Sequence, residues 1–315
     1  MKYIGLQSQI WRNNTRSVLL LTLFPLVILG LVMVFFLIYS IYQPEAEIDP
    51  VDGFLRTIPW VAAGVMLWFT IAWFSHSKMI SKATGSRPLE RKDNKRVYNL
   101  VENLSIAAGM KRMPKINVIE DDSLNAFASG INEKTYTISL SRGIINKLDD
   151  EELEAVIAHE LTHIRNKDVR LLIISVIFVG IFAFITQALL RSLIYGGRRR
   201  GGSSKNNGLA LVLVMILAAV GWFLTTLFRF ALSRKREYLA DAGAAELTRR
   251  PYALASALRK VSGDPRIEAV TRKDVAQMFI EHPGEEKKKN KVSFSSLFAT
   301  HPPIQERIRI LEGMM

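Results

Sequence analysis

The stretch Ala158-His159-Glu160-Leu161-Thr162-His163 decides how this sequence builds a functional site. Histidines four residues apart project from one face of an α-helix, one turn above the other. At that spacing two imidazoles can hold one Zn²⁺, and Glu160 between them can take a proton from a water at the metal. Two of the five histidines in the chain fall in this stretch, which favours a metal site over a chance pair on a buried helix.

The residues before this stretch predict the helix that the metal site requires. Asp149 is a suitable N-cap, and Glu152 follows three residues later, as in a capping box. An apolar face then recurs at helical spacing, formed by Leu153, Val156, Ile157, Leu161 and Ile164.

Composition limits the chemistry that the chain can perform. The chain has 315 residues and no Cys, which excludes disulfides, thiolate metal sites and a Cys nucleophile. Any metal must therefore be held by His, Asp and Glu. The net charge is +13, but the basic residues flank long apolar runs, so they indicate a lipid bilayer as partner and not a nucleic acid.

Four uncharged or nearly uncharged runs are long enough to cross a membrane, at residues 17–42, 57–77, 171–190 and 208–228. Their only ionisable residue of the Asp, Glu, Lys, Arg or His type is His76, which argues against a transporter. Basic residues precede the first run and follow the second, while 43–53 is acidic. The positive-inside rule then predicts a multi-pass protein of the cell (inner) membrane, with the segment after residue 78 in the cytoplasm.

The loop from Gly196 to Gly208 conflicts with two of these spans. It contains Arg198, Arg199, Arg200 and Lys205 but no acid, and short basic loops resist translocation. Residues on both sides of the 171–232 pair must meet at one metal, so the pair returns to its starting side. Whether it fully spans the bilayer is left open.

A small sheet is predicted just before the metal helix. Residues 88–108 read as a helix ending at Gly109, and Ile116 to Ile119 as a strand. Asn125 to Ala128 and Thr135 to Leu140 read as a hairpin. An edge strand here would pair with an extended peptide, although these strands serve equally well as core. Further on, Pro251 is placed to open a helix, and Ile304, Ile308 and Leu311 mark an amphipathic last helix.

Two histidines leave a catalytic zinc one protein ligand short. The third ligand should come from a downstream element, and Glu237 is the best candidate. Asp241, one turn further on, is suited to orient an imidazole from behind the metal. The alternative is that Glu237 and Asp241 only form a charged helix face.

These motifs together resemble the HtpX family of membrane-bound bacterial zinc metalloproteases and, more distantly, the CaaX prenyl proteases. The resemblance covers nearly the whole chain and rests on the metal helix, the paired apolar runs and three motifs: Asn125-Ala126-Phe127-Ala128, Glu237-Tyr238-Leu239-Ala240-Asp241, and Thr300-His301-Pro302-Pro303 with Arg307. It implies that Glu237 is the third zinc ligand and that residues 125–128 line the substrate cleft. It also suggests His301 as an oxyanion stabiliser and Arg307 as the partner of an acid near the cleft.

We therefore expect an α+β, mostly helical fold: an integral membrane zinc metallopeptidase with a small β-sheet beside the metal helix and four transmembrane helices. Residues 1–77 would hold two N-terminal transmembrane helices and 78–170 the first part of the catalytic domain. Residues 171–232 would hold the hydrophobic helical pair and 233–315 the second part of the catalytic domain, with the third zinc ligand.

The expected activity is hydrolysis of internal peptide bonds with one Zn²⁺ per chain. The resemblance implies misfolded or damaged membrane proteins as substrates, cut on the cytoplasmic side in quality control and stress response. Two alternatives stay open. One is a prenyl-protein protease, for which four spans are few. The other is an inactive membrane scaffold, which would have no use for Glu160. The sequence gives no oligomeric state.

Overall fold

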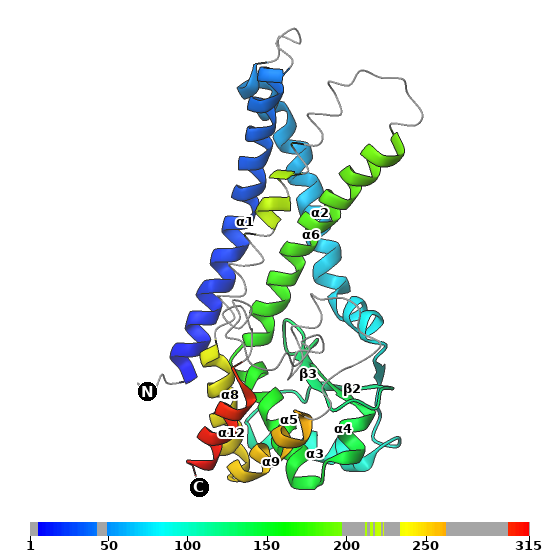
Figure 1. Ribbon diagram of the computed structural model, residues 1–315, viewed down its shortest axis with the longest axis vertical. Helices are drawn as coiled ribbons and strands as arrows, with labels where there is room; N and C mark the ends of the chain where they lie inside the picture. The colour runs from blue at the N-terminus through cyan, green and yellow to red at the C-terminus, as the bar shows by residue number, and fades with distance from the viewer. Residues whose placement is uncertain are drawn as a thin grey trace, which may run out of the picture. The chain divides into compact units, whose positions relative to one another are not determined.

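The structure is a computed structural model that describes residues 6–42, 49–196, isolated positions between 212 and 223, 234–262 and 302–314 (Figure 1). The chain divides into two compact units, each described here by itself. The first unit contains Met1–Thr15, Ser75–Ile173 and Arg229–Met315, and the second contains Arg16–Phe74 and Ile174–Phe228.

The second unit is built from long apolar helices. It takes the larger parts of α1 (Leu6–Tyr42), α2 (Pro50–Thr84) and α6 (Asp168–Gly196). Aromatic rings join them: Phe24 meets Phe182 edge-on at 5.7 Å, and Trp68 meets Phe184 at 5.3 Å. Large apolar side chains on α2 are exposed, as expected of a surface that faces lipid.

By length and composition, three helices in the described part of the chain can cross a membrane. They are Trp11–Ile41, Pro50–Thr84 and Asp168–Gln187. These helices correspond to the first three apolar runs predicted from the sequence. Most of the fourth run, and the basic loop after Gly196, lie outside the described residues.

The first unit contains a four-stranded mixed sheet with strand order β1-β2-β4-β3. Its strands are β1 (Arg87–Pro88), β2 (Lys115–Ile119), β3 (Ala126–Ser129) and β4 (Thr137–Ser141). β2 and β4 are parallel, while β3 and β4 form the predicted antiparallel hairpin. The hairpin turn requires glycine at Gly130, because φ is +116° and a Cβ would lie 2.5 Å from the Thr135 carbonyl oxygen.

The helix predicted over residues 88–108 is shorter than expected. α3 spans Lys95–Ala107, because the Asn94 side chain caps it by accepting a hydrogen bond from the Val97 N–H. Of the residues expected to begin this helix, Pro88 instead belongs to β1 and pairs with Asn117 of β2. Gly109 follows the helix with φ of +66°, as predicted for a C-terminal glycine.

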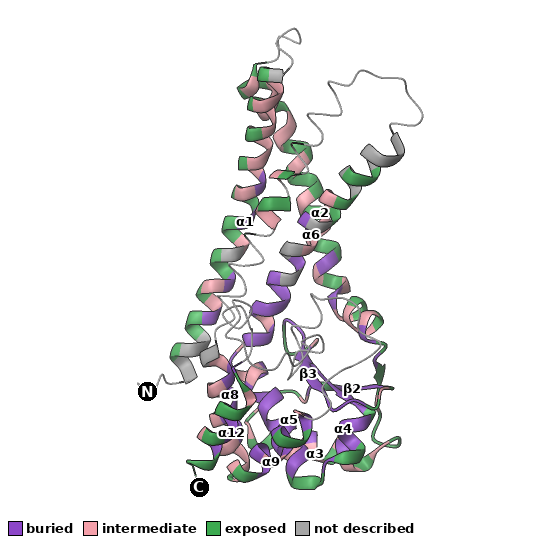
Figure 2. Cartoon of the chain, viewed as in Figure 1, coloured by how far each residue is buried: buried purple, intermediate pink, exposed green. Residues whose placement is uncertain are grey.

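Helix α5 (Asp150–Arg165) is the centre of the first unit, and eleven of its 16 residues are buried. Its N-terminus has the predicted capping box, in which the side chains of Asp149 and Glu152 each accept a hydrogen bond from the other residue's backbone N–H. Glu152 is buried, and it also accepts hydrogen bonds from Ser256 and Lys260. Figure 2 shows this burial along α5 and the neighbouring strands.

Three helices from the C-terminal part of the chain complete this unit. α8 (Arg234–Thr248) and α9 (Pro251–Val261) pack on α5, and α12 (Ile304–Glu312) packs on α9 and α8. Gly243 allows α8 to approach α5 closely, since a Cβ there would lie 2.5 Å from the Thr162 methyl group. Pro251 occupies the first turn of α9, as predicted. A two-residue break, in which Lys167 has φ of 58°, separates α5 from α6.

Candidate metal centre

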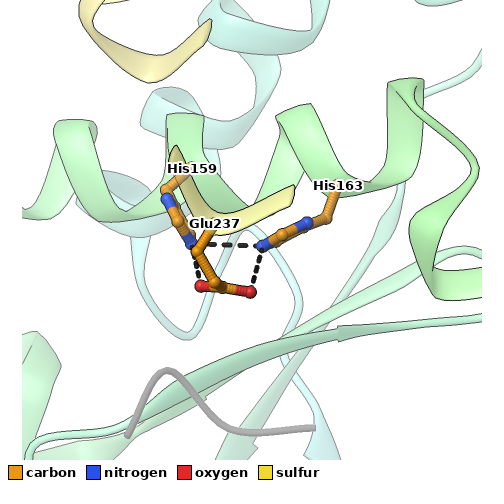
Figure 3. A group of neighbouring side chains, drawn as sticks. All are labelled: His159, His163 and Glu237. Carbon is orange, nitrogen blue, oxygen red and sulfur yellow. Dashed lines mark hydrogen bonds and ion pairs between the residues drawn. The ribbon is translucent and has the colours of Figure 1, made fainter. Parts of the chain in front are cut away.

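Three donor side chains meet on one side of α5 (Figure 3). Nε2 of His159 lies 3.6 Å from Oε2 of Glu237, and Nε2 of His163 lies 3.6 Å from Oε1 of the same carboxylate. The two Nε2 atoms are 3.2 Å apart. Both imidazoles come from α5 and lie on one face of it, because they are one turn apart. The carboxylate comes from the first turn of α8.

This donor set fits a zinc ion. Zinc bonds to imidazole nitrogen and carboxylate oxygen are about 2.0–2.2 Å long, so ligand atoms at tetrahedral angles are separated by roughly 3.3–3.6 Å. The three measured separations of 3.2, 3.6 and 3.6 Å match that spacing. The group has two nitrogen donors and one carboxylate, which is the ligand set of several catalytic zinc sites.

A buried carboxylate supports His159 on the side away from the donors. Nδ1 of His159 lies 3.0 Å from Oδ1 of Asp241. Arg307 of α12 donates two hydrogen bonds to Asp241, from Nε at 2.9 Å and Nη2 at 2.7 Å. Its side chain is fully buried, and its Nη1 lies 3.7 Å from Glu237. We call these residues the arginine arm: His159, Asp241 and Arg307.

The arginine arm concentrates charge in a dry interior. Burial by itself would raise the pKa of Asp241, but the Arg307 guanidinium outweighs it and the pKa falls to about 2. Burial likewise would lower the pKa of His159, but its contacts with Asp241 and Glu237 raise it to about 9. The arm therefore keeps Asp241 ionised beside the imidazole.

A second carboxylate supports His163 in the same way. Nδ1 of His163 lies 3.0 Å from Oδ2 of Asp168, the first residue of α6. Oδ1 of Asp168 accepts a 2.7 Å hydrogen bond from Asn13 Nδ2, and Arg236 is more distant at 3.8 Å. We call His163, Asp168 and Asn13 the amide arm. A carboxylate that accepts a hydrogen bond from Nδ1, as Asp168 does from His163, fixes the tautomer in which Nε2 is free to bind a metal.

Glu160 lies between the two histidines and is buried. Burial raises the pKa of its carboxyl group, while the neighbouring His159 and His163 and the nearby Ala128 backbone oppose that shift. Ala128 belongs to β3, the outermost strand of the sheet. Asn125 O accepts from Ser141 N, so the alternation of an antiparallel ladder directs the backbone groups of Ala126 and Ala128 away from β4.

The remaining site residues expected from the sequence lie in different surroundings. Asn125 is buried, and its Oδ1 accepts a hydrogen bond from the Ala126 N–H at the same edge. Arg307, expected near an acid of the cleft, is paired with Asp241 and has no exposed surface. His301 lies outside the described residues.

Sequence reasoning did not find two of the supporting residues. Asp168 was not among the residues expected at the site, although it follows the second histidine by only five residues. Asn13 gave no signal, because its partner Asp168 is 155 residues away in the chain.

A buried histidine pair with an intervening glutamate, an acid from a second helix and a neighbouring edge strand define a metal-dependent peptidase carried on apolar helices. The chain belongs to Peptidase family M48, a family of metalloproteases whose model matches residues 91–315. The matched region contains every described member of the site except Asn13.

Relatives of the chain bear the name "Protease HtpX homolog". The protein of this name from Bacteroides fragilis is 59% identical over 321 residues, covering 99% of each chain. That from Dictyoglomus thermophilum is 41% identical over 256 residues, covering 81% of each. The crystal structure of S. mikatae Ste24p is similar with a TM-score of 0.48 and 20% identity, covering 96% of this chain and 66% of that one.

Proposed function

We propose that this membrane peptidase is a zinc-dependent endopeptidase that cleaves misfolded or damaged membrane proteins on the cytoplasmic side of the cell membrane. Its quality-control role would belong to a stress response. The observation that carries the proposal is the convergence of His159, His163 and Glu237 within 4.8 Å of one another, directly beside Glu160.

In this proposal the three donors hold one Zn²⁺. When bound, zinc would supply the Lewis acid that activates water and polarises the scissile carbonyl. Glu160 accepts the proton from the attacking water and delivers it to the leaving amine. Its position beside Ala128 supports this role, because α5 packs against β3, the strand where the peptide would bind.

The substrate would bind as an added strand at β3. The carbonyl groups of Ala126 and Ala128 point away from β4, as an extended peptide would need for pairing, while the Ala126 N–H is bonded to Asn125 Oδ1. The Asn125 side chain stabilises this edge by accepting the hydrogen bond from the Ala126 N–H. We assign residues 125–128 to the substrate cleft on this basis, and His301 stays a prediction from family resemblance.

Two features of the chain support a placement of the site at the membrane. Asp168, the first residue of a candidate span, contacts His163. Basic residues next to the apolar runs support a cytoplasmic orientation and a multi-pass arrangement. In the proposed organisation, residues 1–77 and 171–232 form the membrane part, and 78–170 and 233–315 form the catalytic domain.

The test compares purified full-length wild type with Glu160→Gln on a model membrane protein. Glu160→Gln should keep one zinc per chain, because the ligands are unchanged, and should lose nearly all cleavage. Glu133→Gln is the matched control, since Glu133 is exposed in the β3–β4 turn. Wild type without zinc or cleavage would favour the scaffold, and cleavage confined to prenylated peptides would favour the prenyl-protein protease. Retained cleavage by Glu160→Gln would show that Glu160 is not the base.

A further inference from the structure

Asn13 lies on α1, far from the metal helix in sequence, yet its side chain is buried against the junction of α5 and α6. Its Nδ2 donates to Oδ1 of Asp168 at 2.7 Å and to the carbonyl oxygen of Asn166 at 2.8 Å. Both partners are acceptors, so the orientation of the amide is determined by chemistry. Asn166 is the C-cap of α5, whose last carbonyl groups have no partner within the helix.

The same amide holds the carboxylate that orients His163. Asp168 is only 2% exposed, and a buried carboxylate must be hydrogen-bonded or paired. Its two oxygens have different partners: His163 Nδ1 on Oδ2 and Asn13 Nδ2 on Oδ1. Arg236 Nη1 is 3.8 Å from Oδ1, beyond hydrogen-bonding distance. Without Asn13, Oδ1 of Asp168 would keep only the distant Arg236 guanidinium among the described contacts, so the carboxylate that contacts His163 would be held less firmly.

We propose that Asn13 is a positioning residue of the metal centre. It holds Asp168 in the orientation that presents Nε2 of His163 to the metal. The N-terminal helix α1, a candidate membrane span, therefore also contributes a residue to the metal centre. This inference rests on the proposed zinc function, and it concerns a residue outside the segment that the family model matches.

Metal affinity tests the inference without reference to turnover. Zn²⁺ is titrated into full-length protein in detergent against a chromophoric chelator. Asn13→Ala should bind Zn²⁺ about 10-fold more weakly, at the lower end of the roughly 10–100-fold range for groups behind a metal ligand. Asp168→Ala should lose more. The double variant should bind as weakly as Asp168→Ala alone, because Asn13 acts through Asp168.

Two further variants separate positioning from simple helix packing. Asn13→Asp preserves volume but replaces the donor with a second carboxylate, so it should lose at least as much affinity as Asn13→Ala. Thr15→Ala is the control, because Thr15 is exposed and its hydroxyl bonds only to Trp11 of the same helix in the described contacts. It should bind Zn²⁺ as wild type does. The absorption spectrum of bound Co²⁺ should change in Asn13→Ala and not in Thr15→Ala.

The outcomes distinguish this inference from the proposed function. If wild type binds no Zn²⁺, the proposed function fails. If wild type binds Zn²⁺ and Asn13→Ala matches it in affinity and Co²⁺ spectrum, the inference alone is overturned. Additive losses in the double variant, or a tolerated Asn13→Asp, would likewise overturn it and assign Asn13 to helix packing.

Discussion

The two arms of the metal centre each orient a histidine with a carboxylate, but they hold that carboxylate with different groups. In each arm a histidine of α5 places Nδ1 3.0 Å from a buried carboxylate. The arginine arm backs that carboxylate with a fully buried guanidinium, whereas the amide arm uses a neutral side chain. Breaking a buried ion pair is costly because a buried charge loses its counter-charge, whereas loss of a neutral donor removes a hydrogen bond and changes no charge. Substitutions in the two arms should therefore differ in their effects on protein stability and on zinc affinity.

The largest effect should follow from breaking the arginine arm. Arg307→Ala leaves the Asp241 carboxylate buried without its cation, which typically destabilises a protein by about 3–5 kcal/mol. Denaturant unfolding in detergent should show the loss, and zinc affinity should fall with it. Arg309→Ala, an exposed change on the same helix, is the control. An Arg307→Ala variant as stable as wild type would contradict the assigned role of the pair.

Metal removal should separate the two arms. At zinc concentrations near 100 times Kd, binding stabilises the folded state by about 2.7 kcal/mol, which a chelator should abolish. Glu237→Ala should show no such zinc-dependent shift. In the chelated protein, Arg307→Ala should still lower the free energy of unfolding, because the Asp241 charge stays buried. Asp168→Asn should then lower it very little. Equal penalties for both variants without metal would show that the arms do not differ in this way.

Removing each carboxylate's charge compares the arms directly. Asp241→Asn should weaken zinc binding about 100-fold and Asp168→Asn about 10-fold, the two ends of the usual range for such groups. The difference arises because Asp241→Asn also removes the carboxylate that pairs with buried Arg307 at 2.7 Å, whereas Glu237 is more distant at 3.7 Å. Chelator competition gives both affinities. The reverse ranking would mean that His163 depends more on its partner than His159 does.

The smallest effect should come from the contact that brings α8 to α5. Gly243→Ala places a methyl group against Thr162, an overpacking change that typically costs about 1–3 kcal/mol, with the lower end expected here. Because α8 carries both Glu237 and Asp241, zinc affinity should fall as well. Thr162→Ala in the same chain should restore much of the loss by making room. Gly64→Ala is the control, since nothing lies within 4 Å of its added Cβ.

Local sequence determined the elements whose hydrogen bonds and periodicity are short-range. The helical repeat alone places His159 and His163 on one face, and the capping box from Asp149 to Glu152 sets where α5 begins. The hairpin of β3 and β4 was likewise predicted, because its two strands are close in sequence and joined by a turn that contains Gly130. The start of α3 was predicted too early because the Asn94 N-cap was missed, and only the pairing of Pro88 with Asn117 is a contact between separate segments.

Tertiary structure alone decided which distant groups complete the site. The sequence offered Glu237 and Asp241 as candidates, but only the packing of α8 on α5 brings the Glu237 carboxylate to both imidazoles. Asn13 could not be found at all, because an asparagine in an apolar helix has no local feature that names a partner 155 residues away. The physical reason is that helix geometry relates residues only a few positions apart. A buried carboxylate such as Asp168 needs a hydrogen-bond donor, and the fold can supply that donor from any part of the chain.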